Sequence, residues 1–227
     1  DGGLATLGKE YAYTVKQFSE ERTTYILFYM DTHGEPMTLS AGYAQVKCQL
    51  DENRRVVSET YLDMAGNPVV NTSGYAQMTK TYNAKGQTAT QTYLGLDGQP
   101  VRAKVGYASI KRSYDTAGNV IEEHYFDTDG QPIALFSGAA SVQKAYDAKQ
   151  QVIRQAFFGA DGAPVVIKSG YSIIERGYDD AGNVNEEHYF GTDGQPLVQS
   201  SGAAAVQKEY DEKGQVIRQA FFGVNGE

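Results

Sequence analysis

Tyrosine is the residue type that this sequence places most regularly where a ligand could be bound. Four tyrosines follow a glycine and precede a small residue at the same point of a recurring pattern: Tyr43, Tyr75, Tyr107 and Tyr171. An aromatic ring beside polar groups can stack on a sugar ring, and the hydroxyl offers a hydrogen bond. We therefore predict these four tyrosines as candidate ligand-binding residues, with shallow grooves where the ring is replaced by Ala139 and Ala203. The alternative is that the rings only pack one unit against the next.

The residue types needed for catalysis do not come together in this sequence. The three histidines are His33, His124 and His188, and the last two occupy equivalent positions of the recurring pattern, which favours strand residues on the solvent side over a catalytic pair. Adjacent carboxylates such as Glu122 and Glu123 project to opposite faces of a strand, which separates them. No Ser/His/Asp or Cys/His set suggests a nucleophile. We predict that the chain is not an enzyme.

Metal ions and cofactors are not indicated either. Asp127 and Asp129 before Gly130 have the oxygen ligands that calcium prefers, but only this one unit keeps both carboxylates, so turn formation explains them better. The single cysteine, Cys48, excludes an internal disulfide and a four-cysteine zinc site, and is expected to be a small apolar strand residue. No glycine-rich phosphate loop precedes a helix. We predict no metal site and no cofactor.

The prolines show that all these residues belong to a repeating unit of constant length. The six prolines recur at a constant 32-residue spacing: Pro36, Pro68, Pro100, Pro132, Pro164 and Pro196. A fixed period of this length marks a repeat architecture, in which each unit buries its apolar face against its neighbours. The 227 residues hold seven such periods and three further residues. We predict a single array of seven 32-residue units over residues 1–227, cut from a longer array.

Each unit has the pattern of a β-hairpin. Two turns recur in the units, and Asp-x-x-Gly is the form that both share, as at Asp115–Gly118 and Asp127–Gly130. Asp at the first position with Gly at the fourth is typical of a type I turn followed by a G1 bulge. Counting outward from this turn pairs Tyr114 with Val120, and the same count places Lys144 opposite Arg154. Alternating apolar and polar residues indicate a sheet with one packed face. We expect strands of about eight residues, followed by a short extended piece such as 132–137.

These patterns predict an all-β fold of tandem 32-residue β-hairpin repeats, stacked as an elongated solenoid. The composition agrees, with 17 Tyr and 9 Phe to form half-buried strands and 25 Gly to form turns. A closed seven-bladed β-propeller is the alternative, although a unit of this length is short for the four strands of a blade.

The last four units also repeat in pairs. Residues 114–158 match residues 178–222 far better than they match residues 146–190. The tetrapeptides Glu-Glu-His-Tyr and Arg-Gln-Ala-Phe alternate, and they begin at Glu122, Arg154, Glu186 and Arg218. The pattern thus has a longer period of two units, which we call the superperiod. A duplication of two units explains it, and so does attraction between opposite charges on neighbouring units.

Charge and hydropathy exclude two classes of partner. The formal net charge is −8, whereas a nucleic-acid-binding protein normally carries a basic face. No apolar run is long enough to span a membrane, and no signal peptide is present. We predict no nucleic acid partner and no membrane insertion.

Two groups of bacterial surface repeats resemble these motifs. The octapeptide Tyr-Phe-Asp-Thr-Asp-Gly-Gln-Pro at 125–132, followed by Gly138, resembles the cell-wall-, choline- and glucan-binding repeats, which include toxin-type repeats. The pentapeptide Tyr-Asp-Thr-Ala-Gly at 114–118 resembles the tyrosine-aspartate (YD/RHS) repeats. The resemblance implies a bacterial, extracellular or cell-surface array of stacked hairpins.

A function follows from this resemblance. It implies a non-catalytic, secreted or cell-surface module that acts as an extended adhesive or spacer scaffold, with a cell-wall glycan, a host glycan or a surface protein as its partner. The alternative is a carbohydrate-binding module for such a glycan.

Overall fold

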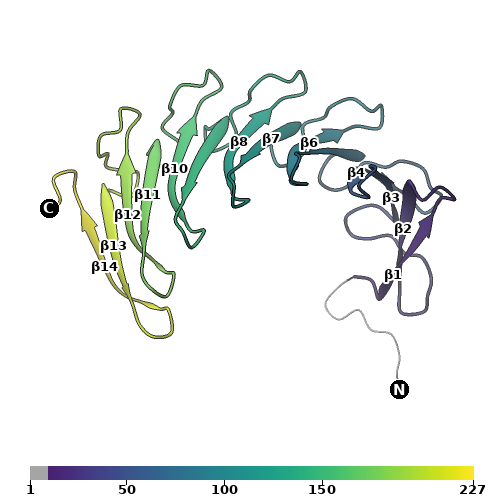
Figure 1. The fold of residues 1–227 in the computed structure, drawn as a ribbon, viewed down its shortest axis with the longest axis horizontal. Helices are drawn as coiled ribbons and strands as arrows, with labels where there is room; N and C mark the ends of the chain where they lie inside the picture. The colour runs from purple at the N-terminus through teal and green to yellow at the C-terminus, as the bar shows by residue number, and fades with distance from the viewer. Residues whose placement is uncertain (1–9) are drawn as a thin grey trace. The chain divides into compact units, whose positions relative to one another are not determined.

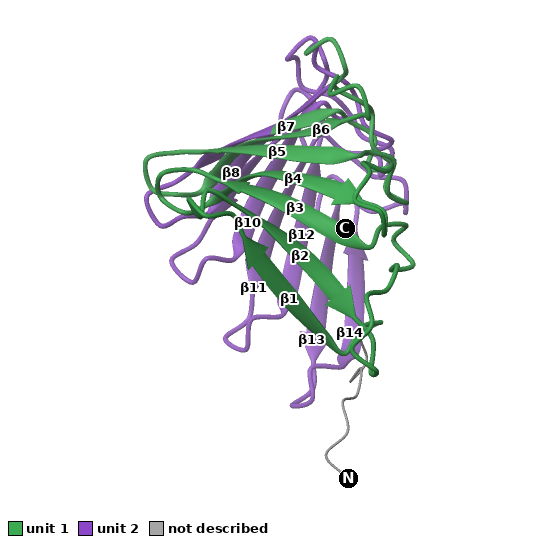
Figure 2. Cartoon of the chain, turned by 90° about the vertical axis from the view of Figure 1, so that its right-hand side faces the viewer, with its two compact units in different colours: residues 1–110, 127–130 green, residues 111–126, 131–227 purple. Residues whose placement is uncertain are grey.

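The structure is a computed structural model, and it describes residues 10–227, so the first nine residues of the predicted array lie outside the described part. The described residues form fourteen strands and no helix (Figure 1). They fall into two compact units (Figure 2): unit 1 extends to Ile110 and includes residues 127–130, and unit 2 comprises residues 111–126 and 131–227. Within each unit, the strands follow one another along the sheet in the order of the chain. The predicted all-β fold of tandem hairpins is confirmed.

The strands alternate between six and seven residues, slightly shorter than expected. Unit 1 contains β1 (Tyr13–Phe18), β2 (Thr24–Met30), β3 (Gln45–Leu50), β4 (Val56–Leu62), β5 (Gln77–Tyr82) and β6 (Thr88–Leu94). Strand β7 (Ser109–Tyr114) begins in unit 1 and ends in unit 2. Unit 2 contains β8 (Val120–Phe126), β9 (Ser141–Tyr146), β10 (Val152–Phe158), β11 (Ile173–Tyr178), β12 (Val184–Phe190), β13 (Ala205–Tyr210) and β14 (Val216–Phe222).

Successive hairpins join edge to edge through backbone hydrogen bonds. In unit 1, β2 pairs with β1 on one side and with β3 on the other. In unit 2, β10 pairs with β9 and with β11 in the same way. The blades of a propeller are separate sheets, so the alternative of a seven-bladed propeller is wrong.

The Asp-x-x-Gly turns have the expected chemistry. In the turn after β2, Oδ1 of Asp31 accepts hydrogen bonds from the backbone N–H groups of His33, at 2.8 Å, and Glu35, at 3.0 Å. Gly34 has a φ of 83°, a conformation that is unfavourable for residues with a Cβ atom. Gln150 holds the same conformation, with φ of 64°, in the turn between β9 and β10.

A β-bulge follows the turn between β9 and β10 and makes the observed strand register differ from the predicted one. Between β9 and β10 the first pair is the expected one, but Ile153 is then left out of the ladder as a bulge. Lys144 therefore lies opposite Gln155, and the prediction that it faces Arg154 is wrong. Because one bulged residue moves all later side chains to the other face, the bulge separates two like charges.

The prolines lie where the sheet requires no N–H group. Pro36 forms a single β-bridge back to the last residue of β2. The hydrogen bonds on either side come from other residues: Asp31 N–H donates to the Glu35 carbonyl and Met37 N–H donates to the Tyr29 carbonyl, each at 2.9 Å. Such a bridge recurs at every proline. The expected extended piece after proline is therefore a bridge of one residue rather than a strand.

A tyrosine hydroxyl connects four of the hairpins to the hairpin before them. The tyrosine that precedes a second turn donates a hydrogen bond to the carbonyl of the valine that begins the last strand of the preceding hairpin. The oxygen–oxygen distances are 2.6 Å for Tyr82 to Val56, 2.8 Å for Tyr146 to Val120, 2.7 Å for Tyr178 to Val152 and 2.7 Å for Tyr210 to Val184. Each of these bonds, which we call the tyrosine joint, stabilises the contact by about 1 kcal/mol.

A small residue at the corner before each odd-numbered strand from β3 onward is buried. Alanine occupies this position in most units, at Ala44, Ala76, Ala108, Ala140 and Ala204. Ser172 replaces it before β11 and is fully buried, and its Oγ has no hydrogen-bond partner among the described residues. A buried hydroxyl without a partner destabilises the folded state.

The substitution Ser172→Ala should therefore raise the free energy of unfolding by about 1 kcal/mol, because it removes the unpaired hydroxyl and keeps the packing. The reverse exchange, Ala204→Ser, is the matched control and should lower the free energy by a similar amount. Urea denaturation followed by circular dichroism measures both. A destabilised Ser172→Ala variant would contradict this account of the corner.

The same seven residues, Val-Ile-Arg-Gln-Ala-Phe-Phe, form β10 and β14. In β10 the strand is paired on both sides, and Phe157 packs against the buried cluster around Ile174. In β14 the equivalent Phe221 is 58% exposed. The same local sequence thus places Phe157 against a buried cluster and leaves Phe221 mostly in water.

We expect Phe157→Ala to lower the free energy of unfolding by about 2–4 kcal/mol, in the range of buried aromatic truncations. Phe221→Ala should cost less than about 1 kcal/mol, because most of its ring is already in water. Paired denaturation curves of the two variants measure the difference. Equal losses would show that strand propensity, rather than packing between hairpins, determines the contribution of this phenylalanine.

Candidate functional site

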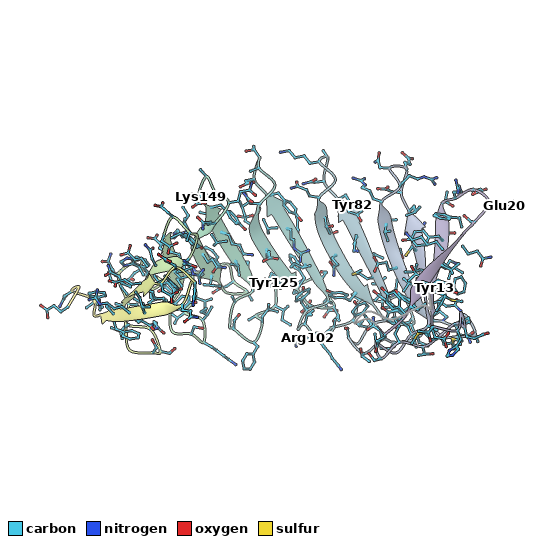
Figure 3. All side chains as sticks on the ribbon, turned by 90° about the horizontal axis from the view of Figure 1, so that it is seen from below. Tyr13, Glu20, Tyr82, Arg102, Tyr125 and Lys149 are labelled. Atoms are coloured by element: carbon cyan, nitrogen blue, oxygen red, sulfur yellow. The ribbon has the colours of Figure 1, made fainter. Side chains whose placement is uncertain are left out.

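The two faces of the sheet carry different side chains. Figure 3 shows the side chains along the strands, with Tyr125 on β8 and Lys149 on the turn between β9 and β10. One face holds Tyr61, Tyr93, Tyr189 and most of the buried residues, and we call it the tyrosine face. The other holds Glu122, His124 and their equivalents, and we call it the histidine face.

The predicted tyrosines lie in a continuous column of rings on the tyrosine face of unit 1. Tyr43 and Tyr75 each pack between tyrosines of the strands on either side, and Tyr107 packs against Tyr93. The distances between ring centroids are 5.9 Å for Tyr29–Tyr43, 4.8 Å for Tyr43–Tyr61, 5.5 Å for Tyr61–Tyr75, 4.5 Å for Tyr75–Tyr93 and 5.8 Å for Tyr93–Tyr107. In unit 2, Tyr171 packs between Phe157 at 6.0 Å and Tyr189 at 5.1 Å. The structure thus gives these tyrosines a packing role, and their binding of a ligand stays a prediction.

The positions without a corner ring are closed. Ala139 and Ala203, where shallow grooves were expected, are each 1% exposed. Ala203 belongs to the buried cluster that includes Ile174 and Val206, so neighbouring side chains fill the space of the missing ring. The prediction of grooves at these alanines is wrong, because the apolar core closes over them.

Burial affects the acidity of groups on the tyrosine face. Desolvation raises the pKa of Tyr189 to about 12, and the neighbouring Glu187 carboxylate adds to the shift. Desolvation also raises the pKa of Cys48, which lies buried in β3 as the expected apolar strand residue. A neutral, buried thiol of this kind is not a reactive nucleophile.

Two glutamates on this face lie between cations of adjacent strands. In unit 2, Glu123 is 3.1 Å from Nε of Arg112 and 2.7 Å from Nζ of Lys144. Burial would raise the pKa of Glu123, but the hydrogen bonds and charges of Lys144 and Arg112 outweigh it and hold that pKa below its usual value. Glu187 has the same arrangement with Arg176 and Lys208.

Neighbouring carboxylates lie on opposite faces, as predicted. Glu122 pairs with Gln143 across the sheet and accepts a hydrogen bond from its Nε2 at 3.1 Å on the histidine face. Glu123 contacts cations on the tyrosine face. The two carboxylates therefore do not converge on one bond.

Two equivalent grooves lie on the histidine face of unit 2. The His124 groove has a volume of about 190 Å³ and is lined by residues that include His124, Phe126, Pro132, Gln143 and Phe158. The His188 groove has a volume of about 310 Å³. Every residue that lines the first groove has a counterpart in the lining of the second, at the spacing of the superperiod.

A histidine lines each groove and has a glutamate beside it; Glu186 also lines the His188 groove, whereas Glu122 lies next to the lining of the His124 groove. Nε2 of His188 lies 2.8 Å from Oε1 of Glu186, and Nε2 of His124 lies 3.7 Å from Oε2 of Glu122. Both histidine side chains are 43% exposed, in agreement with the prediction of solvent-side strand residues. We did not predict the grooves from the sequence, although the recurrence of Glu-Glu-His-Tyr in alternate units was their signal.

The acidic residues of the turns cap their own backbone. Oδ1 of Asp127 accepts the N–H of Asp129 at 2.9 Å, as turn formation requires. Among residues 10–227, no group of three or more His, Cys, Asp or Glu side chains is arranged to hold a metal ion.

The part of the chain that the structure describes contains no helix able to cross a membrane.

Comparison with known proteins gives a limited result. No family model and no curated protein matches the sequence. Among solved structures, the chain is similar to the Tc holotoxin pore of Photorhabdus luminescens, with 12% sequence identity and a TM-score of 0.42 over 89% of this chain and 11% of that chain. It is also similar to the crystal structure of TcdB2-TccC3-TEV, with 14% identity and a TM-score of 0.39 over 90% of this chain and 12% of that chain. Likeness at this level assigns no function.

The lowered pKa values of Glu123 and Glu187 predict a loss of stability in acid. A carboxylate whose pKa is depressed by folding stabilises the protein above its unfolded pKa, near the ordinary value of 4.5, and this contribution is lost as the pH falls through the folded pKa. The double variant Glu123→Gln/Glu187→Gln should therefore show a weaker fall in the free energy of unfolding between pH 5 and pH 3. Denaturation at a series of pH values measures it. An unchanged slope in the double variant would contradict the role of these contacts.

Proposed function

We propose that the chain is a non-catalytic repeat scaffold of a bacterial secreted or cell-surface protein, which extends or displays the surface that the repeats form. The observation that supports this most is the repetition of the tyrosine joint. Four copies with nearly equal geometry connect successive hairpins, so stability is distributed along the chain rather than concentrated around one site. A protein built in this way is suited to present a long surface.

The absence of a convergent set of reactive groups among the described residues agrees with a scaffold. The carboxylates of β8 lie on opposite faces, and Cys48 is buried. Repeated weak contacts along such a surface add through avidity, so an adhesive function needs no single strong site.

The second candidate function is binding of a cell-wall or host glycan. It is favoured by the two equivalent grooves of the histidine face, which combine aromatic and hydrogen-bonding side chains. The corner tyrosines Tyr43, Tyr75, Tyr107 and Tyr171 remain alternative contacts for a glycan, although each ring already packs against its neighbours.

Removal of one superperiod tests the scaffold. Deletion of residues 115–178 joins Tyr114 to Asp179 and so recreates the Tyr-Asp sequence that begins the turn at Asp115. The shortened chain should fold cooperatively, with a denaturant m-value lower by roughly two-sevenths, because m follows the surface exposed on unfolding. Neither chain should show saturable retention on purified bacterial cell walls if the scaffold is the whole function.

Failure of the shortened chain to fold would contradict an array of interchangeable units. Saturable retention that increases from the shortened to the full chain would contradict a pure scaffold and support glycan binding.

A further inference from the structure

The histidine face carries a feature that the scaffold does not explain. Its grooves open to solvent, whereas the tyrosine face carries most of the buried residues and both glutamates that lie between cations. At each groove the glutamate beside the histidine lies directly opposite a glutamine of the next strand, Glu122 opposite Gln143 and Glu186 opposite Gln207. Side chains that only packed hairpins together would not need this polar cluster.

We propose that the His124 and His188 grooves are two equivalent subsites for a neutral glycan made of pyranose residues. This inference rests on the second candidate function, glycan binding, and assigns it to the histidine face rather than to the corner tyrosines.

The chemistry of the lining favours a sugar ring over other small ligands. The carboxylate of Glu186 accepts hydrogen bonds, the amide of Gln207 donates and accepts them, and the imidazole of His188 does either according to its tautomer. Vicinal hydroxyl groups are both donors and acceptors and match such a set. Phe190 and Phe222 line the same groove and offer apolar surface to the C–H face of a pyranose.

Size and charge agree with this ligand. Volumes of about 190 and 310 Å³ are at or below the lower end for small-molecule sites, so each groove suits one or two sugar residues rather than a larger compound. The glutamate accepts hydrogen bonds, and the histidine donates or accepts them according to its tautomer. The described residues of each groove do not bring together the three or more ligands that a metal ion needs.

The units between the grooves lack the polar set. Position 156, equivalent to His124 and His188, is an alanine, and Arg154 replaces the glutamate. Arg154 instead pairs with Glu175, with 3.4 Å between Nε and Oε1. The site therefore recurs once per superperiod, while the aromatic position at Phe158 is shared by every unit of this region.

The spacing of the two grooves fits a polymer. Strands β8 and β12 are four strands apart in unit 2 and are joined by continuous pairing. At about 4.8 Å per strand, the grooves are roughly 19 Å apart. An oligosaccharide that reaches both grooves would bind more tightly than one that fills a single groove, through the effective concentration of the second site.

Proton NMR of the imidazole groups tests the proposal on the full chain, because the protein has only three histidines. The probes are cellotriose and triacetylchitotriose, each titrated to saturation or to its solubility limit. For at least one probe, the His124 and His188 signals should shift with a Kd on the order of 1 mM. The signal of His33, in the turn after β2, should not shift. The matching hexasaccharide should bind about tenfold more tightly.

Single variants assign the sites. Gln207→Ala should weaken the shift of His188 at least severalfold and leave that of His124 unchanged, and Gln143→Ala should do the reverse. Either variant should reduce the affinity for the hexasaccharide to that for the trisaccharide. Glu175→Ala, at the position equivalent to these glutamines in the intervening unit, is the control and should bind as the wild type does.

Unshifted histidine signals with all probes would overturn the proposal. If the full chain still showed saturable retention on cell walls, glycan binding itself would stand and the corner tyrosines would become its sites. If retention were also missing, both the subsites and the second candidate function would fail.

Discussion

The pairing of each hairpin's outer edge is the constraint on which the rest of this structure depends. An isolated two-stranded hairpin is marginally stable. Its outer edge carries a row of unpaired N–H and C=O groups that can pair with the wrong strand. Here the next hairpin covers that edge, as β3 covers β2 and β11 covers β10. The fixed period follows, because an inserted residue would move the tyrosine joint away from its valine carbonyl.

Proline and glycine are placed by the same constraint. At the end of β2, the chain turns back and forms one bridge at Pro36, where the neighbouring N–H groups of Asp31 and Met37 supply the hydrogen bonds. The turn closes because Gly34 adopts a positive φ. The most regular residues in the sequence thus serve the connection between hairpins rather than a ligand.

Two consecutive strand residues can have separate roles because they lie on opposite faces. Glu123 stabilises the tyrosine face between Arg112 and Lys144, whereas Glu122 lies beside His124 on the histidine face. A scaffold and a binding surface are therefore compatible in one array. The superperiod affects mainly the histidine face, because only alternate units carry the histidine and the glutamate found at each groove.

The sequence by itself determined the period, the hairpins, the turn chemistry and the alternation of faces, because each depends on residues close together in the chain. Asp31 and Gly34 specify their turn without help from other units. Only the tertiary structure decided the bulge at Ile153, the column of tyrosine rings and the grooves. These features bring together residues from two or three strands, and a shift of one residue in register exchanges the two faces. Local pattern cannot determine that register, because the competing pairings differ only in contacts between distant parts of the chain.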